Sequence, residues 1–88
     1  MESVFDTQTC VDEAGHPLTF AYILLQDELP DFPSFRADYG IKIRSSSGEE
    51  VAIPHITPDR KRLEQLLNLL CEQNVSPIHL RDIIDDWL

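Results

Sequence analysis

The chain has 88 residues, of which 42% are hydrophobic, and this is ordinary for one small globular domain. Its net charge of −9 argues against binding to nucleic acid or to anionic membranes, which requires a dominant basic surface. The sequence shows neither a signal peptide nor an apolar run near the ~20 residues of a membrane helix. We therefore expect a soluble, cytoplasmic protein.

The first third of the chain predicts an antiparallel hairpin. Ser3 to Val11 alternates roughly and is rich in residues that favour strands, which indicates a strand over about 3–11. The turn follows at Glu13 to Pro17, where glycine and proline favour a bend. Leu18 to Gln26 is apolar on both faces and predicts a second, central strand over about 18–26.

The segment from Asp27 to Phe35 predicts an irregular loop. Pro30 and Pro33 exclude a helix interior and remove two backbone donors. A loop of this length in a small domain is either a connection or a functional segment. We take Phe32 and Phe35 as candidate contact residues for a protein partner.

A second hairpin is predicted next, with strands over about 38–45 and 49–55. Tyr39 to Arg44 alternates cleanly, so that Lys42 and Arg44 should point away from the core. Glu49 or Glu50 is then expected to pair with Arg44 across the two strands. Pro54 marks a strand end or a sheet edge, because proline cannot donate to a ladder.

The last third predicts two helices, over about 58–73 and 77–87. Thr57-Pro58 and Ser76-Pro77 each provide a capping side chain followed by a proline suited to the first turn. The connection is so short that the helices should be antiparallel neighbours or cross steeply. Each helix carries an apolar stripe, formed by Leu63, Leu66, Leu67 and Leu70 in the first and by Leu80, Ile83, Ile84, Trp87 and Leu88 in the second.

These elements predict an α+β fold in one domain spanning residues 1–88. We expect a four-stranded antiparallel sheet of two hairpins, followed by an antiparallel pair of helices packed on one face. Such a pair would set basic residues at the start of the first helix opposite acidic residues at the end of the second. The expected ion pairs join Arg60 or Arg62 to Asp85, Asp86 or the terminal carboxylate, the alternative being a solvated surface.

Candidate chemistry in the chain is sparse. The only cysteines, Cys10 and Cys71, lie far apart in sequence and are expected to be reduced and partly buried. No phosphate loop, nucleophile motif or zinc motif is present, so we expect neither an enzyme nor a cofactor. His79, Asp82 and Asp86 fall within one arc of the second helix and could supply part of a metal site, although Asp82 could simply neutralise its neighbour.

The basic run and the terminal tryptophan are the remaining candidates for a binding surface. Arg60, Lys61 and Arg62 could hold a phosphate or an acidic tail, or could be solvated or paired within the chain. Trp87 could belong to the core or complete a dimer interface. The leading hypothesis is a non-enzymatic protein-interaction or regulatory module, monomeric or weakly dimeric; the alternative is a small-ligand or metal-binding protein.

Three stretches of the chain resemble a known family. They are Tyr39-Gly40-Ile41, the helix start ITPDR at residues 56–60 and the terminal segment VSPIHLRDIIDDWL at residues 75–88, and they are similar to small proteins of Gram-positive bacteria that are grouped as a domain of unknown function. The resemblance covers roughly residues 18–88 and implies a cytoplasmic bacterial protein, but no activity. The matching positions are Tyr39, Gly40, Ile41, Ser76, Pro77, His79, Leu80, Asp82 and Asp86.

Overall fold

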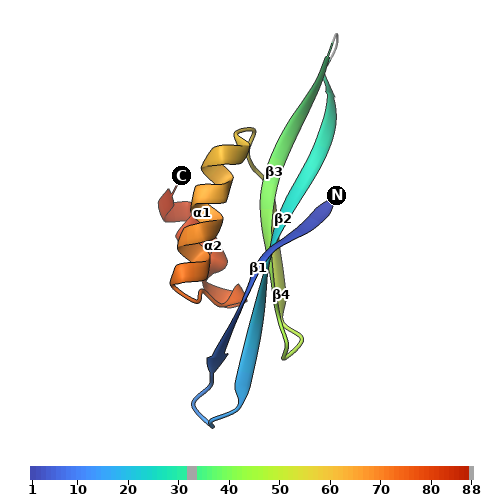
Figure 1. Cartoon of the computed structure of the whole chain (residues 1–88). Coiled ribbons are helices and arrows are strands. Elements are labelled where there is room, and N and C mark those ends of the chain that lie inside the picture. The colour runs from blue at the N-terminus through green and yellow to red at the C-terminus, as the bar shows by residue number, and fades with distance from the viewer. Residues whose placement is uncertain (32–33, 88) are drawn as a thin grey trace.

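A computed structural model describes residues 1–31 and 34–87, and the side chains of these residues outside 29–36. Four strands form one antiparallel sheet in the order β1-β2-β3-β4, and helices follow them (Figure 1). The predicted α+β class is therefore confirmed. The elements are β1 Glu2–Val11, β2 Pro17–Asp31, β3 Ser34–Ser45, β4 Glu50–Thr57, α1 Arg60–Glu72, the 3₁₀ helix η1 Pro77–His79 and α2 Leu80–Trp87.

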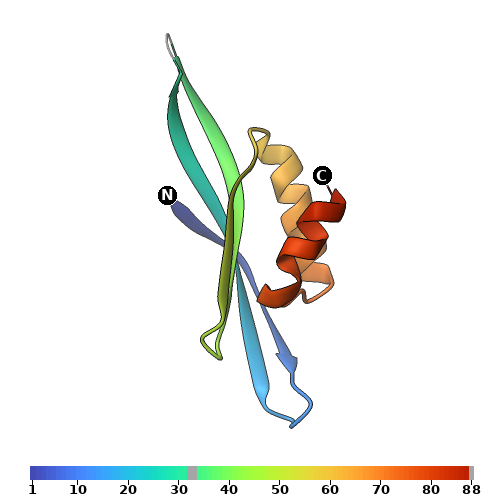
Figure 2. The ribbon, with the colours of Figure 1, turned by 180° about the vertical axis from the view of Figure 1, so that it is seen from behind.

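The core lies between the sheet and the helices. Figures 1 and 2 show α1 and α2 on the same side of the sheet, and α1 contacts all four strands. Alternate side chains of β2 and β3 meet the leucine stripe of α1, because successive strand residues point to opposite faces. The buried cluster consists of Phe20, Tyr22, Leu24, Ile41, Ile43, Leu63, Leu66, Leu67, Leu70, Cys71, Val75, Leu80 and Ile84.

In the segment predicted as an irregular loop, 27–35, the described residues 27–31 and 34–35 instead belong to strands β2 and β3. β2 extends to Asp31 and β3 begins at Ser34, so that Pro30 is opposite Phe35 in the register. Here β2 and β3 pair only with each other. The pairing of β1 with β2 extends no further than Leu25, and the pairing of β4 with β3 extends no further than Tyr39. A proline is compatible with such a ribbon because each strand has a free side where no donor is needed. Phe32 lies outside the described residues, and so does the side chain of Phe35.

The helix starts also differ from the prediction. The N-cap of α1 is Asp59, whose Oδ1 accepts a hydrogen bond from the Arg62 N–H at 3.3 Å. Thr57 Oγ1 accepts from the N–H of Asp59 at 3.2 Å and so stabilises the turn before the helix. Ser76 occupies the N-cap position of η1 without a side-chain bond, and α2 starts after this 3₁₀ turn.

Tyr22 joins the sheet to the corner between the helices. Its ring is fully buried, and its hydroxyl donates to the Val75 carbonyl oxygen at 2.9 Å. Burial raises the pKa of this hydroxyl well above its ordinary value, so it remains a donor. The bond provides a hydrogen-bond partner for the carbonyl of Val75, a buried residue in the turn after α1.

Gly40 lies beside an irregularity in β4. The register of β3 and β4 shifts between Tyr39 and Ile41, and His55 has a positive φ of 57° at this point. A Cβ on Gly40 would meet the Ile53 carbonyl oxygen and would lie 2.6 Å from the Pro54 Cα. The close approach of the two backbones therefore requires glycine.

We expect Gly40→Ala to lower the free energy of unfolding by about 2 kcal/mol or more, because backbone atoms of β4 would have to move. Gly48→Ala is the matched control. Gly48 has a φ of +102° but nothing within 4 Å of an added Cβ, so only the backbone penalty of about 1 kcal/mol applies. Urea unfolding measures both variants, and equal losses would contradict the steric explanation.

The two cysteines are free thiols, Cys10 partly buried and Cys71 buried. Burial raises the pKa of the Cys71 thiol from 9.0 to about 11. The folded protein then keeps a proton that the unfolded chain loses, so this contribution is complete below about pH 9 and disappears as the pH rises towards 11.

We expect the free energy of unfolding of Cys71→Ala to fall less between pH 9 and pH 11 than that of the natural protein. The difference between the two decreases should be up to about 2–3 kcal/mol over this range. The matched control is Cys10→Ala. The measurement is the free energy of unfolding as a function of pH, so that the packing cost of each substitution cancels in the slope. Identical slopes for the two variants would contradict the assignment.

Candidate functional site

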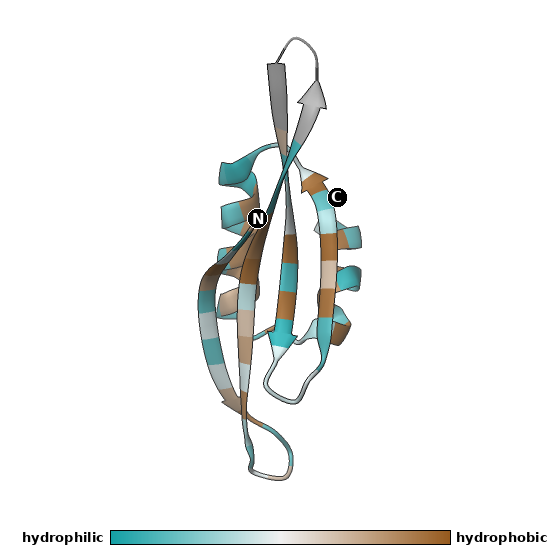
Figure 3. Ribbon diagram, turned by 90° about the vertical axis from the view of Figure 1, so that its right-hand side faces the viewer, coloured by the Kyte–Doolittle hydropathy of each residue, from teal (hydrophilic) through white to brown (hydrophobic). Residues whose placement is uncertain are grey.

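Among the described residues, no helix covers the face of the sheet opposite α1 and α2. Figure 3 looks onto this face, with the helices behind the strands and with hydrophobic and hydrophilic residues alternating along β3 and β4. Ala21 and Ile23 of β2 are directly opposite Arg44 and Lys42 of β3. Because cross-strand partners share a face, this surface combines apolar side chains with long cationic ones.

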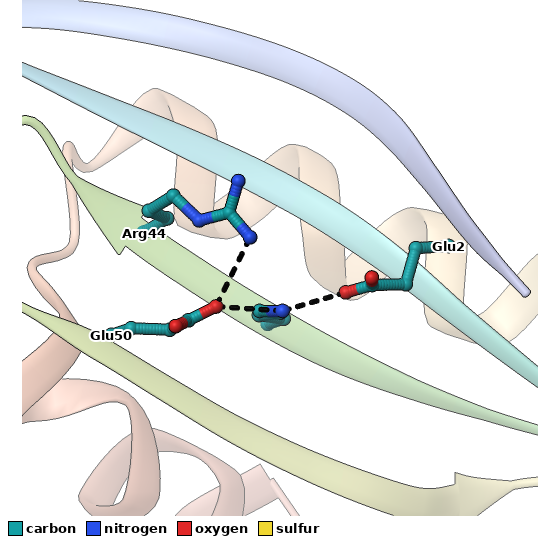
Figure 4. A network of polar contacts seen from close by, with 4 residues as sticks. Glu2, Arg44 and Glu50 are labelled. Carbon is teal, nitrogen blue, oxygen red and sulfur yellow. Dashed lines mark hydrogen bonds and ion pairs between the residues drawn. The ribbon is translucent and has the colours of Figure 1, made fainter.

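Four charged residues form a network across this face (Figure 4). Lys42 Nζ lies 2.7 Å from Glu2 Oε1 and 2.6 Å from Glu50 Oε1. Arg44 Nη2 lies 3.2 Å from the same Glu50 oxygen, so the pairing of Arg44 with Glu50 occurs as predicted. The network joins β1, β3 and β4, the first of which is two strands away from Lys42.

The electrostatics of the network follow from Lys42, whose side chain is only 17% exposed. Its hydrogen bonds lower the pKa of Glu2 and of Glu50, and the two carboxylates in turn raise the pKa of Lys42. All the groups are therefore charged at neutral pH. Lys42 also lies opposite the buried Ile23, so its aliphatic stem shares the face with an apolar side chain.

Strand β1 and the preceding Met1 carry four of the six exposed large hydrophobic residues in the described part of the chain. Met1, Val4 and Val11 are 66–76% exposed and Phe5 is 36% exposed. Phe5 is the extra residue of a bulge, because the register with β2 shifts between Val4 and Asp6. Since β1 is at one edge of the sheet, its side chains and its outer backbone groups are accessible together.

His55 lies between two carboxylates at the other edge. Its Nε2 is 3.3 Å from Asp27 Oδ2, and its Nδ1 is 3.4 Å from Asp38 Oδ2. The two carboxylates therefore contact different nitrogen atoms of the imidazole. His55 also has a left-handed backbone conformation, with a φ of 57°.

The basic run expected at a binding surface is largely engaged within the helices. Arg60 Nε lies 3.0 Å from Glu64 Oε1 of the next turn. The guanidinium of Arg62 lies over the Trp87 ring, 4.7 Å from its centroid, as a cation–π contact. Lys61 is exposed. Trp87 is half-buried and packs against the core cluster.

The ion pairs predicted from Arg60 or Arg62 to Asp85 or Asp86 do not form among the described residues. The terminal carboxylate belongs to Leu88, which lies outside them. The contact between Arg62 and Trp87 shows that the start of α1 does lie near the end of α2. The arginine is therefore placed as expected, but its partner is an aromatic ring.

The three residues proposed for a metal site are all exposed. His79 closes the 3₁₀ turn η1, whereas Asp82 and Asp86 lie on α2. Within residues 1–31 and 34–87, no group of three or more His, Cys, Asp or Glu side chains is arranged to hold a metal ion. The metal-binding alternative therefore gains no support from this part of the chain.

The sequence did not reveal the network around Lys42. The alternation of β3 predicts that Lys42 and Arg44 point outward, but Glu2 is 40 positions away in sequence. Only the strand order brings it near. The only sequence signal was an acidic residue just before the first strand of a predicted hairpin, which is common.

The family comparison covers the whole chain. Residues 1–88 match a protein-family model described as a family of unknown function, DUF6514. No curated protein and no solved structure matches. In the part of the chain that the structure describes, no helix has the length and apolar character needed to cross a membrane.

We expect Lys42→Met to raise the pKa of both Glu2 and Glu50, because their main cationic partner is lost. Arg44→Met is the matched control and should act chiefly on Glu50, which is its ion-pair partner. Carboxyl carbon shifts followed by NMR through the acid range give both values. Unchanged pKa values in Lys42→Met would contradict the geometry of the network.

The same substitution should change how stability depends on pH. A carboxyl group whose pKa is lowered on folding stabilises the protein above its unfolded value of about 4.5, and this contribution is lost as the pH falls through the folded value. Thermal unfolding of the natural protein should therefore respond more steeply below pH 4.5 than that of Lys42→Met.

Proposed function

The chain belongs to the DUF6514 family, a family of unknown function, and we propose that it is a non-enzymatic protein-interaction module. Its binding surface is the uncovered side of the sheet together with β1. The observation that carries the proposal is the exposure of Val4 and Val11, 66% and 68%, on an edge strand beside that face. Exposed apolar side chains on a sheet edge favour association with another chain.

The two sides of the sheet support this choice of surface. The proposal takes α1 and α2 as an antiparallel pair that covers one face and leaves the other available. On the covered side, Arg62 and Trp87 are occupied with each other, which makes the helix ends a weaker candidate than the sequence indicated. On the uncovered side, paired charges lie on the same sheet as exposed apolar groups of its edge strand, and interfaces between proteins combine polar and apolar side chains.

The proposal includes no catalytic residue, no cofactor and no metal. Neither nucleic acid nor membrane is a partner, because the net charge of −9 would repel both. It also takes the chain to act in the bacterial cytoplasm, as a monomer or a weak homodimer. The partner is then a protein whose surface complements a sheet face with paired charges of both signs and exposed apolar side chains.

Affinity capture with matched variants tests the proposal. The double variant Val4→Asp/Val11→Asp places charges on β1, and Ile78→Asp does so on η1, where Ile78 is also 66% exposed. We expect a partner captured by the natural chain and by Ile78→Asp to bind the double variant at least about tenfold more weakly, once it is purified and titrated.

Circular dichroism of each variant provides the control for folding. A partner that binds all three proteins equally would contradict the proposed surface. A partner lost only with Ile78→Asp would move the interaction to the helical side.

A further inference from the structure

We propose that the outer edge of β1 binds an extended, lysine- or arginine-containing segment of another protein as a fifth strand of the sheet. This inference rests on the proposed function and names the class of its partner. It combines three observations: the direction of the backbone groups of β1, the interruption of the opposite edge, and the acidic character of the N-terminal part of the chain.

The hydrogen bonds of the first turn fix which groups of β1 face outward. Asp12 N–H donates to the His16 carbonyl oxygen at 2.9 Å. Hydrogen-bonded and non-bonded pairs alternate in an antiparallel ladder, so Cys10 and Gln8 bond to β2 and the residues between them do not. The outward N–H and C=O groups are those of Thr7, Thr9 and Val11.

The side chains agree with this alternation. Thr9 and Thr19 are opposite each other, and their hydroxyl oxygens are 3.2 Å apart. Such close side chains are typical of a non-hydrogen-bonded pair. The N–H of Thr7 also lacks a partner in β2 and instead donates to Oδ1 of Asp6 at 2.8 Å.

The opposite edge of the sheet is interrupted. Ser45 N–H donates to the Glu49 carbonyl oxygen at 2.7 Å, so by the same alternation Glu50, Ala52 and Pro54 face outward on β4. Pro54 has no N–H to offer, and the left-handed backbone of His55 follows it. A new strand therefore meets a break on β4, whereas β1 contains no proline.

The charges indicate a basic partner. Residues 1–35 contain seven acidic residues and no Lys or Arg. Asp6 is exposed and its carboxylate occupies the N–H of Thr7, which an added strand would need. A cationic side chain on the incoming strand can bind this carboxylate and release the N–H for the ladder. Strand addition and charge recognition are thus coupled at Asp6.

A second copy of the chain fits this edge poorly. Antiparallel pairing of two β1 strands around Thr9 would set Asp6 of each copy opposite Asp12 of the other. Like charges directly opposite each other destabilise a strand pair, and each copy carries a net charge of −9. The occupant is therefore a different protein, whose extended segment supplies the backbone bonds and the positive charge.

The test is an NMR titration of the full chain with an end-capped heptapeptide that alternates Val and Lys. The matched peptide has Glu in place of Lys. We expect the basic peptide to shift the amide signals of Thr7, Thr9 and Val11 and to slow their exchange with solvent, and the acidic peptide to do neither. Slowed exchange reports strand addition in the natural sequence, so this result does not depend on the folding of any variant.

Variants then locate the contact. Thr9→Pro removes an outward donor and should weaken binding of the basic peptide about tenfold or more. Ala52→Pro makes the same change on the β4 edge and should leave the affinity unchanged. Asp6→Asn removes the charge with little change in shape and should reduce the preference for the basic peptide about threefold.

Three outcomes would overturn the inference. One is the absence of any shift at millimolar basic peptide, and another is a shift confined to α1, α2 or the centre of the outer face. The third is slow exchange of the β1 amides in the absence of peptide, together with a dimer detected by sedimentation. This result would assign the edge to a second copy of the chain. If the capture experiment with Val4→Asp/Val11→Asp succeeds while the peptide test fails, the interaction function stands and only strand addition is wrong.

Discussion

The fold depends on the burial of the α1 leucines against the central strands. Leu63, Leu66, Leu67 and Leu70 are at most 1% exposed, and Ile41 and Ile43 beneath them are fully buried. Each such side chain contributes roughly 1.5–3 kcal/mol by leaving water, which is more than any ion pair on the surface of this protein can supply. A domain of this size has a single core, so the helices bury one face of the sheet and the other face remains open.

This one-sided burial explains the character of the uncovered face. A sheet face without a helix must stay compatible with water, and here Lys42, Glu2 and Glu50 provide the polar groups while small or apolar residues lie between them. The network links the edge strand β1 to β3 and β4, so it also limits how far β1 can separate from the sheet. A surface ordered in this way loses little side-chain entropy on binding.

Much of the architecture follows from periodicity. The spacing of Leu63, Leu66, Leu67 and Leu70 identified α1, and the alternation from Tyr39 to Arg44 identified β3 with its outward cations. These patterns are local, and burial imposes them directly on the sequence. The free state of both cysteines was expected from their distance in the sequence, and the pairing of Arg44 with Glu50 was expected from the predicted hairpin.

The predictions were wrong where the role of a residue depends on residues that are far away in the sequence. Pro30 suggested a loop because proline disrupts a sheet interior, but no third strand reaches it. Asp59 replaced Thr57 as the cap because Pro58 lies in the bend before the helix. Arg62 contacts the aromatic ring of Trp87 and not a carboxylate, because Trp87 in the final turn of α2 lies beside it. Neither the strand order nor the phase of α2 is encoded in local periodicity.

The bond from Tyr22 to Val75 spans 53 positions, and this has a consequence for how the chain acquires its structure. All four strands are synthesised before the first leucine of α1, so the apolar side of the meander has no cover while it emerges from the ribosome. Contacts of such long range close late, and uncovered strands are prone to associate wrongly in the meantime. The nascent chain thus exposes apolar strands until the residues of α1 and α2 have left the ribosome, and a general chaperone that binds apolar strands would act in this interval.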